Sequence, residues 1–175
     1  MKKCLLIVLI ILIFSLVACK GNNNQDKNND KTDEEFVDFE ELEGASYIYF
    51  RKLGYKQVKI RLEDNDSAKE LLANAELAPK KELGLLGPRS DGYVFWVRCN
   101  ISFEHDDKEY ELEAGDVVLS GRNIMVVYDT SHSHGPVLCT KIGKVVGMTK
   151  EEIKEYFSLE ESPIPDCAIG TKIIE

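Results

Sequence analysis

The sequence predicts a mainly β fold over residues 45–175, a closed antiparallel β-barrel with two short helices. Most periodic segments alternate apolar and polar residues, the period of a strand with one buried face. Only two segments repeat with the 3.6-residue period of a helix. Because so few helices separate the predicted strands, parallel crossovers are scarce, and an antiparallel sheet closed on itself is favoured.

The chain is organised around residues 115–147, which contain three β-rich runs. The runs at residues 117–119 and 124–128 are parted by a short loop with glycine, the pattern of a β-hairpin. A third run, residues 137–146, follows the polar loop at residues 131–136. Together these runs predict an antiparallel meander in the barrel wall.

The first 18 residues have the features of a secretory signal peptide: two lysines, then an apolar core of about a dozen residues. A membrane-spanning helix needs roughly 20. The sequence Leu16-Val17-Ala18-Cys19 resembles the lipobox of bacterial lipoproteins. The resemblance implies cleavage before Cys19 and attachment of acyl chains to Cys19. We therefore expect a lipid anchor on the extracytoplasmic face of the bacterial cell membrane.

Residues 19–44 are expected to carry the lipid and to form a disordered, acidic tether. Asn, Asp, Lys, Gln and Glu dominate residues 21–35, which contain too little apolar surface to offset the entropy of ordering. About 25 residues of flexible coil span roughly 25–30 Å. The apolar groups of residues 36–42 leave a second interpretation open, in which that segment docks on the domain.

The charge of the chain excludes some partners. The formal net charge is −9, and loss of the two signal-peptide lysines makes the mature chain more acidic still. Such acidity argues against binding nucleic acid, or anionic lipid through the protein surface.

The elements before residue 80 follow from local patterns. Residues 58–63 alternate apolar and polar side chains, which predicts a strand with one buried face. Asp64-Asn65-Asp66-Ser67 contains several possible N-caps for a helix that ends near Pro79. Residues 47–53 predict a strand whose two faces are Tyr47, Tyr49 and Lys52 against Ile48, Phe50 and Leu53.

The later elements are predicted in the same way. Residues 80–92 contain three glycines and a proline and are expected to form a long loop. Residues 93–101 and 109–113 alternate as strands. Thr149-Lys150-Glu151-Glu152 has the spacing of a capping box and starts the second helix. Residues 168–174 are expected to form a last strand.

The order of these elements, and four stretches of sequence, resemble the bacterial cyclophilin-like domain family. The stretches are residues 62–72, 114–117, 124–128 and 140–146, and the resemblance covers about residues 46–157. It implies a cyclophilin-like barrel but transfers no active residue, because the Phe-His-Arg and Met-Ala-Asn-Ala segments of prolyl isomerases have no counterpart. Residues 83–101 depart from the family pattern.

Trp96 and Arg98 are the first candidate ligand-binding residues. Both fall on one face of the strand predicted at residues 93–101. A guanidinium beside an indole is suited to binding a peptide or a small molecule. In the alternative, Trp96 belongs to the core and Arg98 extends its charged end to water.

His132 and His134 are the second pair of candidates. In an extended loop, residues two apart share a side, so both imidazoles are positioned to bind one Zn²⁺ or Cu²⁺. A third ligand is not determined by the spacing. The alternative is two exposed loop histidines without a ligand.

Three cysteines remain after the signal peptide and Cys19, namely Cys99, Cys139 and Cys167. An exported protein permits a disulfide, but the sequence does not decide which two would pair. Cys99 and Cys139 lie in apolar strands, where buried thiols are expected. A catalytic pair of Cys139 with a loop histidine is a further alternative. Asp116 is expected to close the turn before its strand.

These observations favour a membrane-anchored extracytoplasmic lipoprotein whose barrel binds a small molecule or a peptide segment. Two alternatives are a peptidyl-prolyl isomerase acting on exported proteins and a metal-binding lipoprotein that uses the loop histidines. No catalytic residue is assigned. No cofactor is expected, because the sequence has no phosphate-binding glycine loop, paired zinc knuckle or nucleophile elbow.

Overall fold

The computed structural model describes residues 44–131, 135–158 and 166–173. The signal peptide, Cys19, the tether up to residue 43, and both His132 and His134 lie outside the described residues. The predictions that concern them therefore stay predictions.

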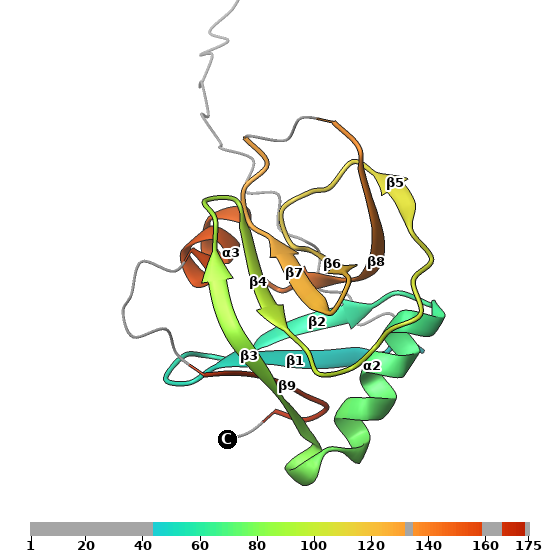
Figure 1. The fold of residues 1–175 in the computed structure, drawn as a ribbon. Coiled ribbons are helices and arrows are strands. Elements are labelled where there is room, and N and C mark those ends of the chain that lie inside the picture. The colour runs from blue at the N-terminus through green and yellow to red at the C-terminus, as the bar shows by residue number, and fades with distance from the viewer. Residues whose placement is uncertain (1–43, 132–134, 159–165, 174–175) are drawn as a thin grey trace, which may run out of the picture. The chain divides into compact units, whose positions relative to one another are not determined.

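The described chain contains nine strands and two α-helices (Figure 1). In chain order they are β1 (Tyr47–Lys52), β2 (Val58–Leu62), α2 (Asp66–Leu77), the short 3₁₀ helix η1 (Pro79–Lys81), β3 (Glu82–Ser90), β4 (Val94–Arg98), β5 (Lys108–Tyr110), β6 (Asp116–Ser120), β7 (Asn123–Val127), β8 (Val137–Val146), α3 (Lys150–Phe157) and β9 (Cys167–Gly170).

Eight of the strands form a closed antiparallel barrel, which confirms the predicted fold class. The strands pair in the order β2-β1-β9-β3-β4-β7-β6-β8, and β8 pairs again with β2. β5 is attached outside this ring, to the first residues of β8. The predicted β6–β7 hairpin is confirmed. The predicted meander is wrong, because β8 lies beside β6 and not beside β7.

The barrel closes through the pairing of β2 with β8, in which Gly143 lies against the β2 backbone. Gly143 is the register partner of Leu62 on β2 and of Val117 on β6. A Cβ atom at this position would lie 2.5 Å from the carbonyl oxygen of Arg61 and 2.9 Å from Cγ2 of Ile60. The closing strand pair therefore requires a residue without a side chain.

Inward-facing residues of the strands and of the two helices form one hydrophobic core inside the barrel. Phe50 and Phe95 meet edge to face with ring centroids 5.5 Å apart. Phe157 of α3 packs on both, with centroids 5.5 and 5.4 Å away. Ile153 and Tyr156 are buried beside it, as the helical period predicts. This aromatic cluster anchors α3 to the barrel.

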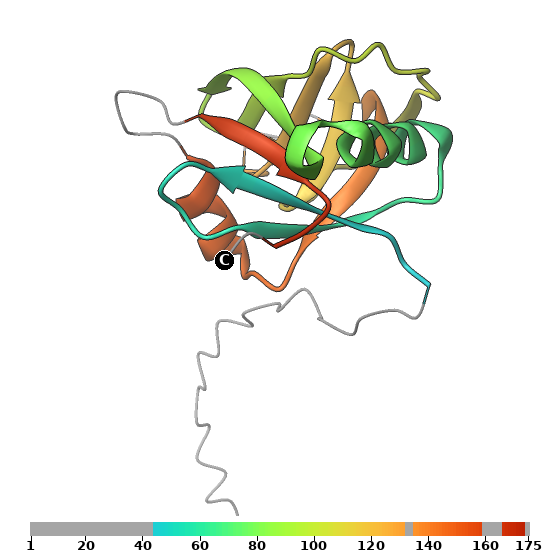
Figure 2. The ribbon, with the colours of Figure 1, turned by 90° about the horizontal axis from the view of Figure 1, so that it is seen from below.

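The two helices cover opposite ends of the barrel (Figures 1 and 2). The sequence predicted several possible N-caps for α2. Asn65 is the N-cap residue, and its Oδ1 accepts a hydrogen bond from Ala68 N at 2.9 Å. In α3, both hydrogen bonds of the predicted capping box are present, between Thr149 and Glu152.

The prediction of a long loop at residues 80–92 is wrong. Most of it is β3, which pairs with β9 on one side and with β4 on the other. Its glycines suggested a loop, yet Gly84 and Gly87 lie within the strand. Gly87 has φ +55°, and the register between β3 and β4 shifts by one residue between Leu86 and Arg89. This is a β-bulge, and a glycine with positive φ is suited to it.

Lys52 also departs from its prediction. Its side chain is 2% exposed, whereas Leu53 is 58% exposed. Lys52 continues the inward row of Ile48 and Phe50. Its ammonium donates to the carbonyl of Tyr156 and lies 4.4 Å from the centroid of the Tyr156 ring. These contacts offset the cost of burying the charge.

Replacing Gly143 by alanine should destabilise the protein, because the new methyl group would press against the β2 backbone. We expect a loss of about 1–3 kcal/mol in the free energy of unfolding, measured by denaturant titration. Gly84→Ala is the matched control, since a Cβ at Gly84 meets nothing within 4 Å. Equal stability of the two variants would contradict this account of closure.

Asp129 should stabilise the fold in a pH-dependent way. It follows β7, and its carboxylate accepts from Lys154 Nζ of α3 at 2.7 Å and from Ser131 N at 2.8 Å. These bonds, that of Lys154 first, hold the pKa of Asp129 well below its usual range. A carboxyl with a lowered pKa in the folded state stabilises above its unfolded pKa, about 4, and loses that effect as pH falls further.

Asp129→Asn should therefore lower the melting temperature by a few degrees at pH 7, and this difference should shrink as pH falls below about 4. The control is Asp106→Asn, whose partner Lys108 is exposed. That exposed pair should contribute little at any pH. A difference for Asp129→Asn that is the same at pH 7 and pH 3 would rule out the proposed ion pair.

Candidate functional site

A filled barrel offers its outer wall and its loops to ligands. On the outer wall, the strand register aligns one side chain from each of five neighbouring strands: Arg89 (β3), Trp96 (β4), Met125 (β7), Val118 (β6) and Lys141 (β8). The adjacent row begins with Leu86, Arg98 and Asn123. We call Leu86, Arg89, Trp96, Arg98 and Met125 the Trp96 face.

The predicted pairing of Trp96 and Arg98 on one strand face is confirmed. Trp96 is half-buried and Arg98 is exposed, while Phe95 and Val97 between and beside them point into the core. However, the guanidinium over the indole belongs to Arg89, whose Cζ lies 5.1 Å from the ring centroid. Sequence reasoning missed Arg89 because it lies in the segment that was predicted as a loop.

The β-bulge of β3 is what brings Arg89 to this face. Leu86 and Arg89 are three residues apart, so in a regular strand they would face opposite sides. The bulge at Gly87 and Pro88 inserts one residue, and Leu86 then pairs with Arg98 while Arg89 pairs with Trp96. Both side chains therefore lie on the outer wall.

Hydrogen bonds fix the ends of the strands that carry this face. The hydroxyls of Ser90 and Tyr128 lie 2.5 Å apart, which joins the residue after Arg89 to the end of β7. Asp91 Oδ1 accepts from Val94 N at 3.1 Å and closes the turn between β3 and β4. The Trp96 face is thus held on packed strands, and its backbone is defined before a ligand arrives.

At the other end of the aligned row, Lys141 is neutralised. Its Nζ lies 2.8 Å from Oδ1 of Asp116, a fully buried carboxylate. The geometry is that of an ion pair without the alignment of a hydrogen bond. Asp116 Oδ2 accepts from Glu113 N at 2.9 Å, which confirms that Asp116 closes the turn before β6.

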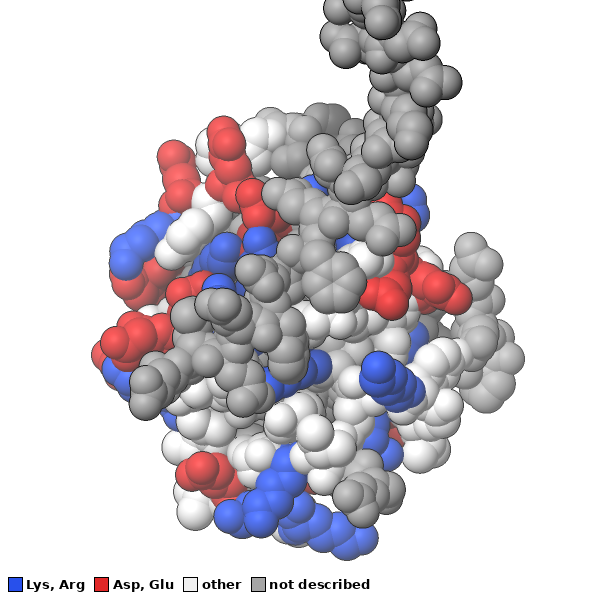
Figure 3. Space-filling model, turned by 180° about the vertical axis from the view of Figure 1, so that it is seen from behind, with Lys and Arg blue, Asp and Glu red and all other residues white. Residues whose placement is uncertain are grey.

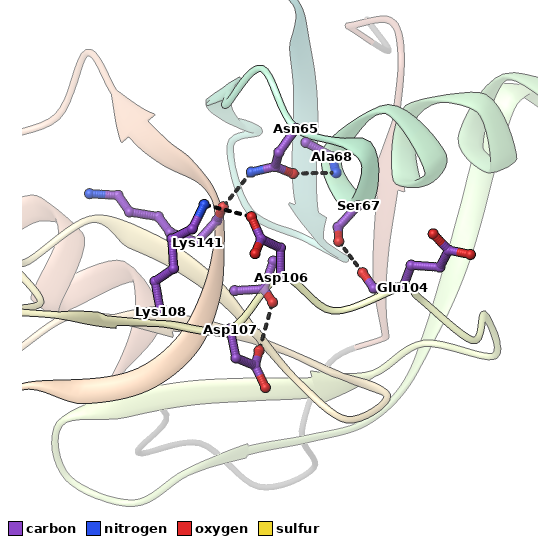
Figure 4. Close-up of polar contacts among 9 residues, drawn as sticks. Asn65, Ser67, Ala68, Glu104, Asp106, Asp107, Lys108 and Lys141 are labelled. Carbon is purple, nitrogen blue, oxygen red and sulfur yellow. Dashed lines mark hydrogen bonds and ion pairs between the residues drawn. The ribbon is translucent and has the colours of Figure 1, made fainter.

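A polar network ties the start of α2 to β8 and to the segment before β5 (Figure 4). Asn65 Nδ2 donates to the carbonyl of Lys141 at 2.8 Å, and Ser67 Oγ donates to the carbonyl of Glu104. Thr140 Oγ1 donates to Asp107 Oδ1 at 2.7 Å. The bonds of Asn65 and Ser67 to backbone carbonyls hold the start of α2 in place. Among the described residues, no group of three metal-ligating side chains is assembled.

All three cysteines of the domain are buried thiols. This confirms the expected burial of Cys99 and Cys139, and no disulfide joins the three. Burial raises the pKa of each thiol, in the case of Cys167 to about 11. The carboxylates of Asp107 and Asp116 raise the pKa of Cys139 further. The Cys139 thiol is therefore protonated at neutral pH and is a poor nucleophile.

A cavity of about 260 Å³ lies apart from the Trp96 face, between the start of β1, the end of β2 and the first turns of α2. Part of its charged lining is already paired, because Lys69 Nζ lies 2.7 Å from Asp64 Oδ1. No strand of the Trp96 face contributes to this cavity, which is lined by Gly44, Ala45, Ser46, Leu62, Glu63, Asp64, Ala68, Lys69 and Leu72.

No helix in the described part of the chain has both the length and the apolar character needed to cross a bilayer. A scan against protein-family models gives no match, and a search of curated proteins gives none. Among solved structures, the chain is similar to that of McbB in complex with tryptophan, with a TM-score of 0.50 and 14% sequence identity. The match covers 73% of this chain and 45% of the McbB chain, and at this identity it concerns the fold alone.

Proposed function

We propose that this chain is a lipid-anchored extracytoplasmic protein whose barrel is a binding module, and that its ligand binds at the Trp96 face. The observation that carries the binding proposal is the half-buried Trp96 with Arg89 stacked on it, on an outer wall beside exposed Arg98. Tryptophan and arginine are the residues most enriched among those that dominate binding energy.

The surroundings of Trp96 support a ligand with an apolar part. Leu86 is 51% exposed, and Met125 is partly exposed next to the indole. Methionine adapts its shape to different partners, and an indole offers a large apolar area at a low entropic cost. An extended peptide or a small molecule fits such a surface, which is open to solvent and has a rigid backbone.

The anchor proposal rests on the sequence Leu16-Val17-Ala18-Cys19 and on the short apolar core before it. Cys19→Ala should remove the acyl chains, and the protein should then leave the membrane fraction or remain an unprocessed precursor. Fractionation and the mass of the mature N-terminus are the measurements. A wild-type protein whose Cys19 carries no acyl mass would refute the anchor.

Trp96 is the single tryptophan of the chain, so its fluorescence reports directly on the proposed site. Peptides that bind the Trp96 face should shift its emission when they are titrated into the mature lipoprotein in detergent. For a peptide found in this way, Trp96→Ala should weaken binding by about 30-fold, the factor expected for a residue contributing about 2 kcal/mol.

Leu77→Ala is the matched control for that titration. Leu77 is 86% exposed at the end of α2 and lies on an element that does not contribute to the Trp96 face. Its replacement should leave peptide binding, measured by calorimetry, unchanged. Binding that survives Trp96→Ala would place the ligand elsewhere. Acceleration of prolyl isomerisation that disappears in Arg98→Ala would instead support an enzyme.

A further inference from the structure

We infer that the Trp96 face binds an extended acidic peptide segment, with two carboxylate side chains at alternate positions that pair with Arg89 and Arg98. This inference rests on the proposed function and names the chemical class of its ligand.

Arg89 and Arg98 are the two charged residues of the Trp96 face. Within the described part of the chain, neither Arg89 nor Arg98 has a carboxylate within 4.0 Å, whereas Lys141, Lys144 and Lys154 are each paired. The chain as a whole carries a formal charge of −9. On the side that Figure 3 shows, acidic and basic side chains are interspersed. Two neighbouring guanidiniums without a carboxylate partner among the described residues are complementary to an anionic ligand.

The spacing then restricts the partner. Arg89 lies beside Trp96 by register, and Arg98 is two residues further along β4. Two residues of strand correspond to about 6.6–6.8 Å. An extended peptide has the same repeat and points alternate side chains to one side. A segment with the pattern acidic–any residue–acidic therefore presents both carboxylates to the two guanidiniums.

The indole contributes the third element of recognition. In the strand register, Trp96 lies between Arg89 on β3 and Met125 on β7, and Arg98 is two residues further along β4. A peptide backbone lying along β4 would cover the exposed part of the indole, and its removal from water strengthens the adjacent charge-assisted hydrogen bonds. Arginine is suited to this role because its planar fork binds a carboxylate through two hydrogen bonds.

The test uses the full mature lipoprotein in detergent and two blocked probe peptides, acetyl-Gly-Glu-Ala-Glu-Gly-amide and its Gln-for-Glu counterpart. The acidic peptide should shift Trp96 emission and bind at least about tenfold more tightly than the neutral one. Arg98→Gln and Arg89→Gln should each reduce the affinity for the acidic peptide about tenfold. Calorimetry measures this affinity. Raising the salt concentration should weaken binding in the wild type.

Lys56→Gln is the control with the same change of charge, because Lys56 is exposed in the turn between β1 and β2. It should bind the acidic peptide as the wild type does. Equal binding of both peptides would overturn the inference and leave the proposed function standing. A shift with neither peptide would count against both. Displacement by micromolar succinate would show that the ligand is a small dicarboxylate and would also overturn the inference.

Discussion

The pairing of β2 with β8 closes the sheet, and the remainder of the fold depends on it. At Gly143 the two strands approach so closely that a Cβ atom would lie 2.5 Å from the Arg61 carbonyl oxygen. Closure satisfies the backbone hydrogen bonds of strands that would otherwise be sheet edges. It also gives the inward side chains a single enclosed core, on which α3 packs through Phe157.

Closure further decides where a ligand is able to bind. Buried side chains form the core inside the barrel and the two helices cover its ends, so the outer wall presents a broad surface to a ligand. On that wall, the β-bulge at Gly87 brings Arg89 to the outer side of β3, where its guanidinium stacks on Trp96. The candidate site therefore depends on one backbone distortion of the barrel. β-Bulges often redirect a side chain in this way near functional sites.

Local patterns predicted much of this arrangement, and non-local pairing explains the rest. The period-two pattern of residues 93–101 correctly placed Trp96 and Arg98 together on one strand face. The position of Arg89 was missed, because β3 is held by β9, a strand more than 70 residues later, and local glycines concealed it. Lys52 was predicted on the strand face opposite Phe50, but it continues the inward row of Ile48 and Phe50. Tyr156, more than 100 residues later in the chain, supplies its partners.

Binding at the outer wall is the central claim, and mapping of amide chemical shifts by NMR tests it most directly. On addition of the acidic probe peptide, the account predicts changes in β3, β4 and β7, greatest around Arg89, Trp96 and Arg98, while β1 and β2 stay unchanged. Changes confined to the cavity beside the start of α2, with the Trp96 face unaffected, would contradict it.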